Sequence, residues 1–171
     1  MAGSLIKISE TTVSSGQSAV TITGLSSTYD VYMLDVVNLE CATDAQELRL
    51  RVTTGGTPDS DSEYDYAMLE LKSYAAYGDS HYDDQANWFL SVIGTPAQEQ
   101  FNGRLFLYNF SNSSKHSFAT WETVATNSVS KCSGGQGGGV HSVNEANDGV
   151  SFYMASGNID SGTFKLYGLN K

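Results

Sequence analysis

Hydrophobic and polar residues alternate at every second position over much of this chain. In the hexapeptide ELRLRV, for example, Leu48, Leu50 and Val52 fall on one face of an extended segment and the two arginines on the other. This pattern predicts a strand that is buried on one face. No segment keeps a 3.6-residue period over three turns, so we expect no helix longer than one turn, between Ala42 and Glu47.

About ten short segments show this strand pattern or are continuously apolar. They are centred on Ile6/Ile8, Val20/Ile22, Val31–Val37, Leu48–Val52, Leu69/Leu71, Trp88–Val92, Leu105–Phe110, Phe118–Val124, Val150–Met154 and Phe164–Leu166. Two of them, Val31–Val37 and Leu105–Phe110, are apolar on both faces. This predicts either a central position in the sandwich or an outer face that another subunit covers.

Turn-forming residues separate these segments, as in Asn147-Asp148-Gly149, where Gly, Asn and Asp supply positive φ or bond to their own backbone. Strands spaced in this way favour an antiparallel arrangement over a βαβ fold. We therefore expect an all-β protein with a single antiparallel, jelly-roll-like β-sandwich of about ten strands with long loops. The chain of 171 residues is predicted to be one domain, 1–171, with 1–10 as an N-terminal strand or arm.

Two stretches are predicted to be long loops and candidates for function, because ligand contacts concentrate on loops held by a rigid scaffold. Asn127–Gly139 is rich in glycine but lacks the Gly-Lys-Ser/Thr of a phosphate-binding loop, so a flexible or assembly-ordered connection is expected. Thr57–Asn87 carries eight acidic residues against the single Lys72, together with five tyrosines. It therefore contributes most of the formal net charge of −10.

The acidic composition excludes some classes of partner. Nineteen Asp and Glu against nine Lys and Arg leave no basic patch for nucleic acid. No apolar run reaches the length of a membrane span, and Met1–Glu10 lacks the apolar core of a signal peptide, so we expect neither membrane insertion nor export by that route. Cys41 and Cys132 are expected to be free thiols, with a disulfide between them as the alternative.

A weak calcium-site pattern lies in the acidic stretch. Asp59, Asp61, Glu63 and Asp65 alternate along the chain, and Glu70 stands at the twelfth place, as in loops that supply oxygen ligands to Ca²⁺. A tyrosine occupies the sixth place, where such loops need glycine for a sharp turn. A solvated acidic loop is therefore the favoured interpretation, and no metal or cofactor is expected.

The sequence offers little for catalysis. His81, His116 and His141 are far apart and match no zinc pattern, and no Gly-x-Ser-x-Gly elbow is present. A glycosidase needs a pair of facing carboxylates, and a sequence with nineteen acids does not exclude such a pair, so this activity stays a less favoured alternative. We therefore expect a protein that is not an enzyme.

Binding is more plausible than catalysis. Tyrosines in long loops with Ser, Asp and Gly form adaptable surfaces of the kind that recognise sugars. Tyr77, His81 and Tyr82 are the candidate ligand-binding residues, although a tyrosine at a strand end is often simply half buried.

The last segment, Ser156–Gly168, reads SGNIDSGTFKLYG and resembles the carboxy-terminal strand-turn-strand of a family of tailed-bacteriophage virion proteins, especially those of marine phages and cyanophages. The family pattern has a Ser-Gly-x-Ile turn and then Ser-Gly-Thr-Phe-x-Leu-Tyr-Gly as a final strand. Tyr29–Asn38, together with the LRLRV strand, and Arg104–Phe110 are similar to the same family. Together these matches cover about a third of the chain.

This resemblance implies a non-enzymatic structural protein of the virion, such as a capsid decoration protein, a head fibre or a tail-fibre component. The expected partners are further copies of the chain, with a homotrimer as first choice, and other capsid or tail proteins. Such a protein would be made in the host cytoplasm. The alternative is a carbohydrate- or receptor-binding module, for which a host-surface glycan would be the partner.

Overall fold

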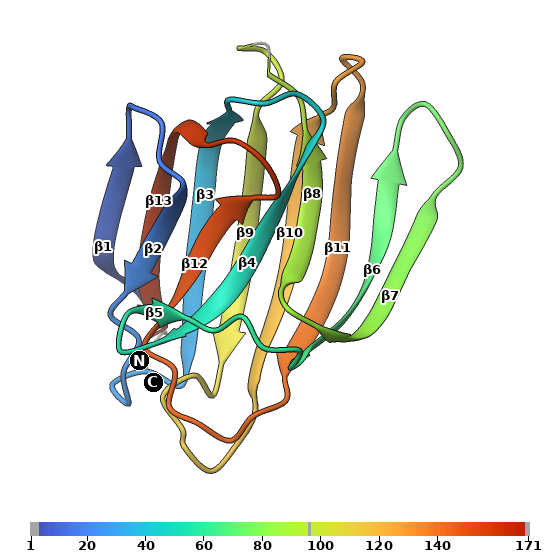
Figure 1. Cartoon of the computed structure of the whole chain (residues 1–171). Helices are drawn as coiled ribbons and strands as arrows, with labels where there is room; N and C mark the ends of the chain where they lie inside the picture. The colour runs from blue at the N-terminus through green and yellow to red at the C-terminus, as the bar shows by residue number, and fades with distance from the viewer. Residues whose placement is uncertain (1–3, 96, 170–171) are drawn as a thin grey trace.

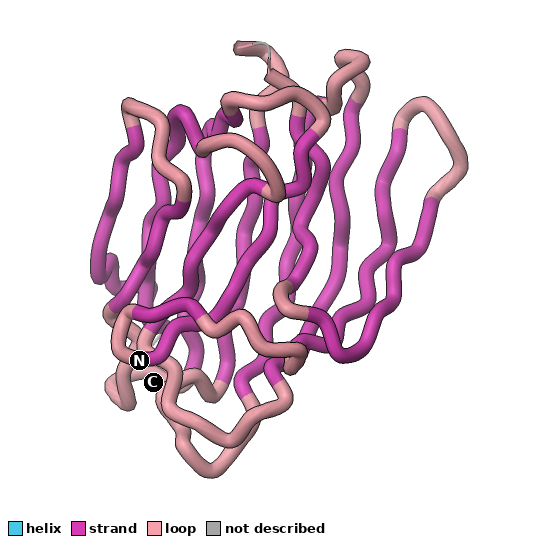
Figure 2. The backbone as a smooth tube through the Cα atoms, in the orientation of Figure 1, coloured by secondary structure: helices cyan, strands magenta, loops and turns pink. Residues whose placement is uncertain are grey.

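The computed structural model describes residues 4–95 and 97–169, and two antiparallel sheets pack face to face in it (Figure 1). These residues form strands, turns and loops, with no helix among them (Figure 2). The all-β sandwich that the alternating pattern predicted is therefore confirmed. Of the predicted N-terminal strand or arm, residues 5–10 belong to the first strand, and residues 1–3 lie outside the described part.

The larger sheet has eight strands in the order β1-β13-β3-β9-β10-β11-β6-β7. Their bounds are β1 Leu5–Val13, β3 Val31–Cys41, β6 Tyr64–Lys72, β7 Gly78–Gln85, β9 Phe101–Tyr108, β10 Ser117–Thr126, β11 Cys132–His141 and β13 Ile159–Leu169. The smaller sheet has the order β2-β12-β4-β5, with β8 also paired to β4. Its strands are β2 Ala19–Thr23, β4 Gln46–Thr54, β5 Thr57–Pro58, β8 Trp88–Ile93 and β12 Gly149–Met154.

Eight of these strands form a jelly roll. The set β1-β13-β3-β9 faces the set β2-β12-β4-β8, and the chain passes from one sheet to the other between β1 and β2, β2 and β3, β3 and β4, β8 and β9, and β12 and β13. This alternation of consecutive strands between two facing sets of four strands is the jelly-roll arrangement. The prediction of a jelly-roll-like sandwich is therefore correct for these eight strands.

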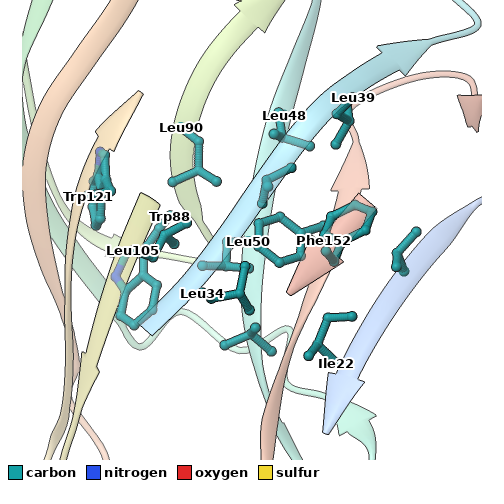
Figure 3. Packing of buried hydrophobic residues seen from close by; sticks show 14 of the residues in the cluster. Ile22, Leu34, Leu39, Leu48, Leu50, Trp88, Leu90, Leu105, Trp121 and Phe152 are labelled. Carbon is teal, nitrogen blue, oxygen red and sulfur yellow. The ribbon is translucent and has the colours of Figure 1, made fainter. Parts of the chain in front are cut away.

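The core lies between the two sheets (Figure 3). Leu48, Leu50 and Val52 on β4 are completely buried, as the alternating pattern predicted, and Phe152 and Trp88 pack into the same cluster. The segments that are apolar on both faces belong to β3 and β9, which lie in the interior of the larger sheet, and this agrees with the predicted central position.

The remaining strands of the larger sheet, β10, β11, β6 and β7, continue it past β9, where β8 of the smaller sheet packs over β10 and β11 and where β6 and β7 form the far edge (Figure 1). They come from two insertions in the jelly roll, one between β4 and β8 and the other between β9 and β12. We call these four strands the extension. The prediction of two long loops, Thr57–Asn87 and Asn127–Gly139, is wrong, because both stretches contain strands and pair with each other through β6 and β11. The count of about ten strands missed β5, β7 and β11.

The glycines of β11 leave room for side chains from neighbouring strands. This close packing explains why β11 contains so many glycines. A Cβ atom at Gly137 would lie 2.5 Å from Cβ of Met68, and one at Gly139 would lie 2.4 Å from Nε1 of Trp88. The glycine-rich sequence therefore reflects close packing against β6 and β8 and not a flexible connection.

Two of the alternating segments present their apolar residues to solvent. Leu69 and Leu71 on β6 are 43% and 38% exposed, and Ile6 and Ile8 on β1 are 41% and 37% exposed. The prediction of a buried apolar face is wrong for these strands. In β6 the inward positions are taken by residues such as Met68, which is 5% exposed, so the leucines face outward.

Candidate functional site

The extension brings His141 against two acidic side chains from the β5–β6 loop. His141 is the last residue of β11, and its side chain is fully buried. Its Nε2 atom lies 2.9 Å from Oδ2 of Asp59 and 3.5 Å from Oε2 of Glu63. These three atoms all lie within 4.8 Å of one another. We call Asp59, Glu63 and His141 the His141 cluster.

Local contacts fix this geometry. The Tyr64 ring packs against the His141 ring with centroids 4.8 Å apart, and the Tyr64 hydroxyl donates a 2.9 Å hydrogen bond to the backbone oxygen of Asp59. The N–H of Asp61 donates to Oδ1 of Asp59 over 2.8 Å. Because Oδ1 is held in this way, Oδ2 of Asp59 is the oxygen that faces the imidazole.

A third carboxylate lies on the other side of the imidazole. Oε1 of Glu145, in the loop between β11 and β12, lies 3.9 Å from Nδ1 of His141. Both of these atoms are buried, and neither has a hydrogen-bond partner in the described part of the chain. His141 therefore has carboxylates facing both of its ring nitrogens.

The two carboxylates of the cluster have pKa values shifted in opposite directions. Burial raises the pKa of Glu63 above its ordinary value, and the adjacent Asp59 carboxylate raises it further. For Asp59, burial also acts to raise the pKa, but the Asp61 N–H, His141 and Glu63 act in the other direction and leave it lowered. Among the described residues, no Lys or Arg forms an ion pair with either carboxylate.

The structure brings together two of the five predicted calcium-site residues, Asp59 and Glu63. The other three lie elsewhere: the Asp61 side chain is exposed, Oδ1 of Asp65 accepts from the N–H of Asp84, and Glu70 pairs with Lys72 and Ser80. His141 takes their place beside Asp59 and Glu63.

The second candidate site is a groove of about 690 Å³ on the outer face of the extension. Its lining includes Ala67, His81, Tyr82, Phe118, Gly138 and Val140. Two of the predicted ligand-binding residues, His81 and Tyr82, thus border one open surface. Tyr77 lies in the turn between β6 and β7, is 71% exposed and is not among the lining residues.

Both cysteines are free thiols. Burial raises the pKa of Cys41 to about 11, and its thiol contacts the backbone oxygens of Thr43 and Gly94. Cys132 is exposed at the start of β11. The part of the chain that the structure describes contains no helix long and apolar enough to cross a membrane.

The fold and its two sites define an all-β jelly-roll protein with an extended sheet, a buried His–carboxylate cluster and an outer groove. Comparison with known proteins does not narrow this class. No protein-family model and no curated protein matches the chain. A structure of infectious bursal disease virus, Gx strain, aligns with 98% of this chain and 36% of that chain at 10% identity and a TM-score of 0.13, which supports no argument.

Proposed function

We propose that this chain is a non-enzymatic structural protein of a phage virion, a capsid decoration, head-fibre or tail-fibre component that acts through symmetric self-assembly on the particle. The observation that carries the proposal is the exposed apolar outer face of the extension. Phe118 and Val124 on β10 are 43% and 51% exposed, and Leu69 and Leu71 on β6 share their face of the sheet. Apolar residues gathered on one face of a soluble protein typically mark an interaction surface.

Five charged residues on the same face of the larger sheet alternate in sign. The strand registers place them in one row across β1, β13, β3, β9 and β10: Glu10, Lys165, Asp35, Arg104 and Glu122. Nε of Arg104 lies 2.7 Å from Oδ1 of Asp35. The row contains three acids and two bases, so four of its charges can pair within it, and the one remaining negative charge would need a cation from the partner that covers this face.

A second copy of the chain is the partner that fits best, and we take a homotrimer as the working state. The C-terminal motif that resembles phage virion proteins forms most of β13, next to β3 in the same large sheet. That resemblance is the reason for the virion assignment and for expecting other capsid or tail proteins as further partners. The exposed apolar residues and the alternating row of charges support a symmetric assembly, in which the same patch occurs on every subunit.

The first test measures self-association. We expect the wild-type chain at micromolar concentration to have three times the 18.4 kDa chain mass by multi-angle light scattering. Val124→Asp, a change at a 51% exposed position, should weaken the assembly at least tenfold without unfolding the subunit. Thr23→Asp, at an exposed position on β2 of the smaller sheet, is the matched control and should leave the mass unchanged. A monomeric wild type that binds neither procapsids nor tails would contradict the proposal.

A carbohydrate- or receptor-binding module is the second candidate, and the groove beside His81 and Tyr82 is the observation that favours it. If a glycan occupies this groove, His81→Ala should abolish at least nine-tenths of the signal on a glycan array. Tyr77→Ala should retain the signal, because Tyr77 lies outside the groove lining. An array that stays blank for the wild-type chain, or equal signals from the two variants, would eliminate the groove as a sugar site.

A further inference from the structure

The His141 cluster places three electron-pair donors around one point. Nε2 of His141 lies 2.9 Å from Oδ2 of Asp59 and 3.5 Å from Oε2 of Glu63. Imidazole nitrogen and carboxylate oxygen are groups that coordinate divalent metal ions. Among the described residues no Lys or Arg forms an ion pair with these carboxylates, so beside a neutral imidazole a cation at this point would compensate them.

The unpartnered atoms behind the imidazole point independently to the same conclusion. A neutral imidazole has one N–H, so it cannot donate to Asp59 through Nε2 and to Glu145 through Nδ1 at once. With the proton on Nε2, Nδ1 of His141 and Oε1 of Glu145 are two buried acceptors 3.9 Å apart, and neither has a partner. If Nε2 binds a metal, the proton moves to Nδ1 and faces Glu145. A carboxylate behind a metal-bound histidine is a frequent arrangement in metal sites.

We propose that Asp59, Glu63 and His141 bind one divalent first-row transition-metal ion, for which Zn²⁺ is the probe, with Glu145 as the carboxylate that orients His141. This inference goes beyond the proposed structural role and does not depend on it. The nitrogen ligand distinguishes the site from a calcium site, which uses oxygen ligands and needs six to eight of them. Three protein ligands leave a fourth position of a tetrahedral ion for water.

The dimensions of the cluster fit such an ion. Ligand atoms around tetrahedral Zn²⁺ lie about 3.3 Å apart, given metal–ligand distances of about 2.0–2.1 Å. The three atoms here lie within 4.8 Å of one another, so small side-chain rotations would bring them to that spacing. The Glu63 side chain is 36% exposed and that of Asp59 20% exposed, which gives an ion access from solvent while His141 stays buried.

A metal at this site would join parts of the chain that are distant in sequence. It would connect the β5–β6 loop to the end of β11 and, through Glu145, to the β11–β12 loop. An ion that binds the folded state and not the unfolded chain raises the melting temperature as its concentration rises. The site would therefore stabilise the attachment of the extension to the jelly roll.

The test is titration of the metal-free full chain with ZnCl₂ by calorimetry and thermal melting. A His81→Ala background removes an exposed imidazole that can bind zinc separately. We expect one Zn²⁺ per chain and a melting temperature that rises with zinc concentration, while millimolar CaCl₂ has no effect. Co²⁺ should give visible absorption bands that report nitrogen and oxygen ligands.

Three variants distinguish zinc binding at the His141 cluster from non-specific binding to acidic side chains. Glu63→Gln, at a part-exposed side chain, should weaken zinc binding at least tenfold, and Glu145→Gln, which leaves all three ligands in place, should weaken it roughly tenfold. Asp61→Asn, which removes an exposed acid from the same loop, should bind zinc like the parent protein. Absence of heat and of a melting shift with Zn²⁺ at submillimolar concentration would overturn the proposal, as would equal losses in Glu63→Gln and Asp61→Asn.

Discussion

Leu50→Asp is expected to abolish cooperative folding. Leu50 is completely buried in β4, and the strand registers pair it with Phe152 on β12 and Trp88 on β8. Figure 3 shows it inside the cluster between the two sheets. An unpaired carboxylate placed there costs several kcal/mol, a large part of the total stability of about 5–15 kcal/mol for a domain.

The measurement is thermal unfolding followed by circular dichroism, with recovery of soluble protein as a second readout. Lys165→Asp is the matched control, because Lys165 lies on β13 between the buried Phe164 and Leu166 and is itself only part buried. The new carboxylate would face Asp35 and Glu10 across the neighbouring strands, at a cost of about 1 kcal/mol. A Leu50→Asp protein that is soluble and melts cooperatively would show that the assigned face of β4 is wrong.

Most of the jelly roll could be predicted from sequence because its strands, with the exception of β1, bury one regular face. In β4 and β13, each inward residue is apolar and the residues between them are polar or part exposed, so alternation alone identified the core. The extension follows a different rule. In β11 the central inward positions, Gly135, Gly137 and Gly139, are glycines, because Trp88 and Met68 fill the space where side chains would lie. The pattern of hydrophobic residues within one segment cannot predict that side chains from other strands fill the space beside its glycines.

The same limit applies to the candidate metal site. The alternating acids identified the segment that contains Asp59 and Glu63, but the third ligand, His141, is distant in sequence. His141 reaches them because β11 pairs with β6 in the register that sets it opposite Tyr64. That register depends on β11, which was expected to be a loop, and on β6, of which only the part around Leu69 and Leu71 was predicted as a strand. For the groove, the clustering of His81 with Tyr82 was predictable from their adjacency, whereas the contribution of Phe118 required the pairing of β10 with β11.

The two insertions of the jelly roll therefore fold as one unit, and the cluster, the groove and much of the exposed apolar face lie on it. If the insertion that contains β10 and β11 paired only with the jelly roll, β6 would have no neighbouring strand on the side where β11 lies. Because β11 pairs with both β10 and β6, the glycine-rich strand connects the jelly roll to β6 and β7. Its packing should consequently have a large influence on stability.

Gly137→Ala is expected to lower the free energy of unfolding by about 3 kcal/mol, at the upper end of the range for overpacked sites. A Cβ at this position would lie 2.5 Å from Cβ of Met68 and 2.7 Å from the backbone oxygen of Ala67. Neither atom is the free end of a flexible side chain, so β6 and β11 would have to separate. The melting temperature should fall by roughly 6–12 °C for a chain of this length.

Gly138→Ala is the matched control one residue further along the strand, on the opposite face. Its Cβ would meet the backbone oxygen of Ala119 at 3.3 Å and Cγ2 of Thr120 at 3.6 Å, which are close to ordinary contacts. The small strain opposes the gain of about 0.4–1 kcal/mol that replacing glycine brings through the unfolded chain, so the net change should stay within about 1 kcal/mol. Equal stabilities for the two variants, measured by denaturant unfolding, would mean that β11 is not held tightly against β6. The glycine-rich segment would then be the flexible connection that its composition first indicated.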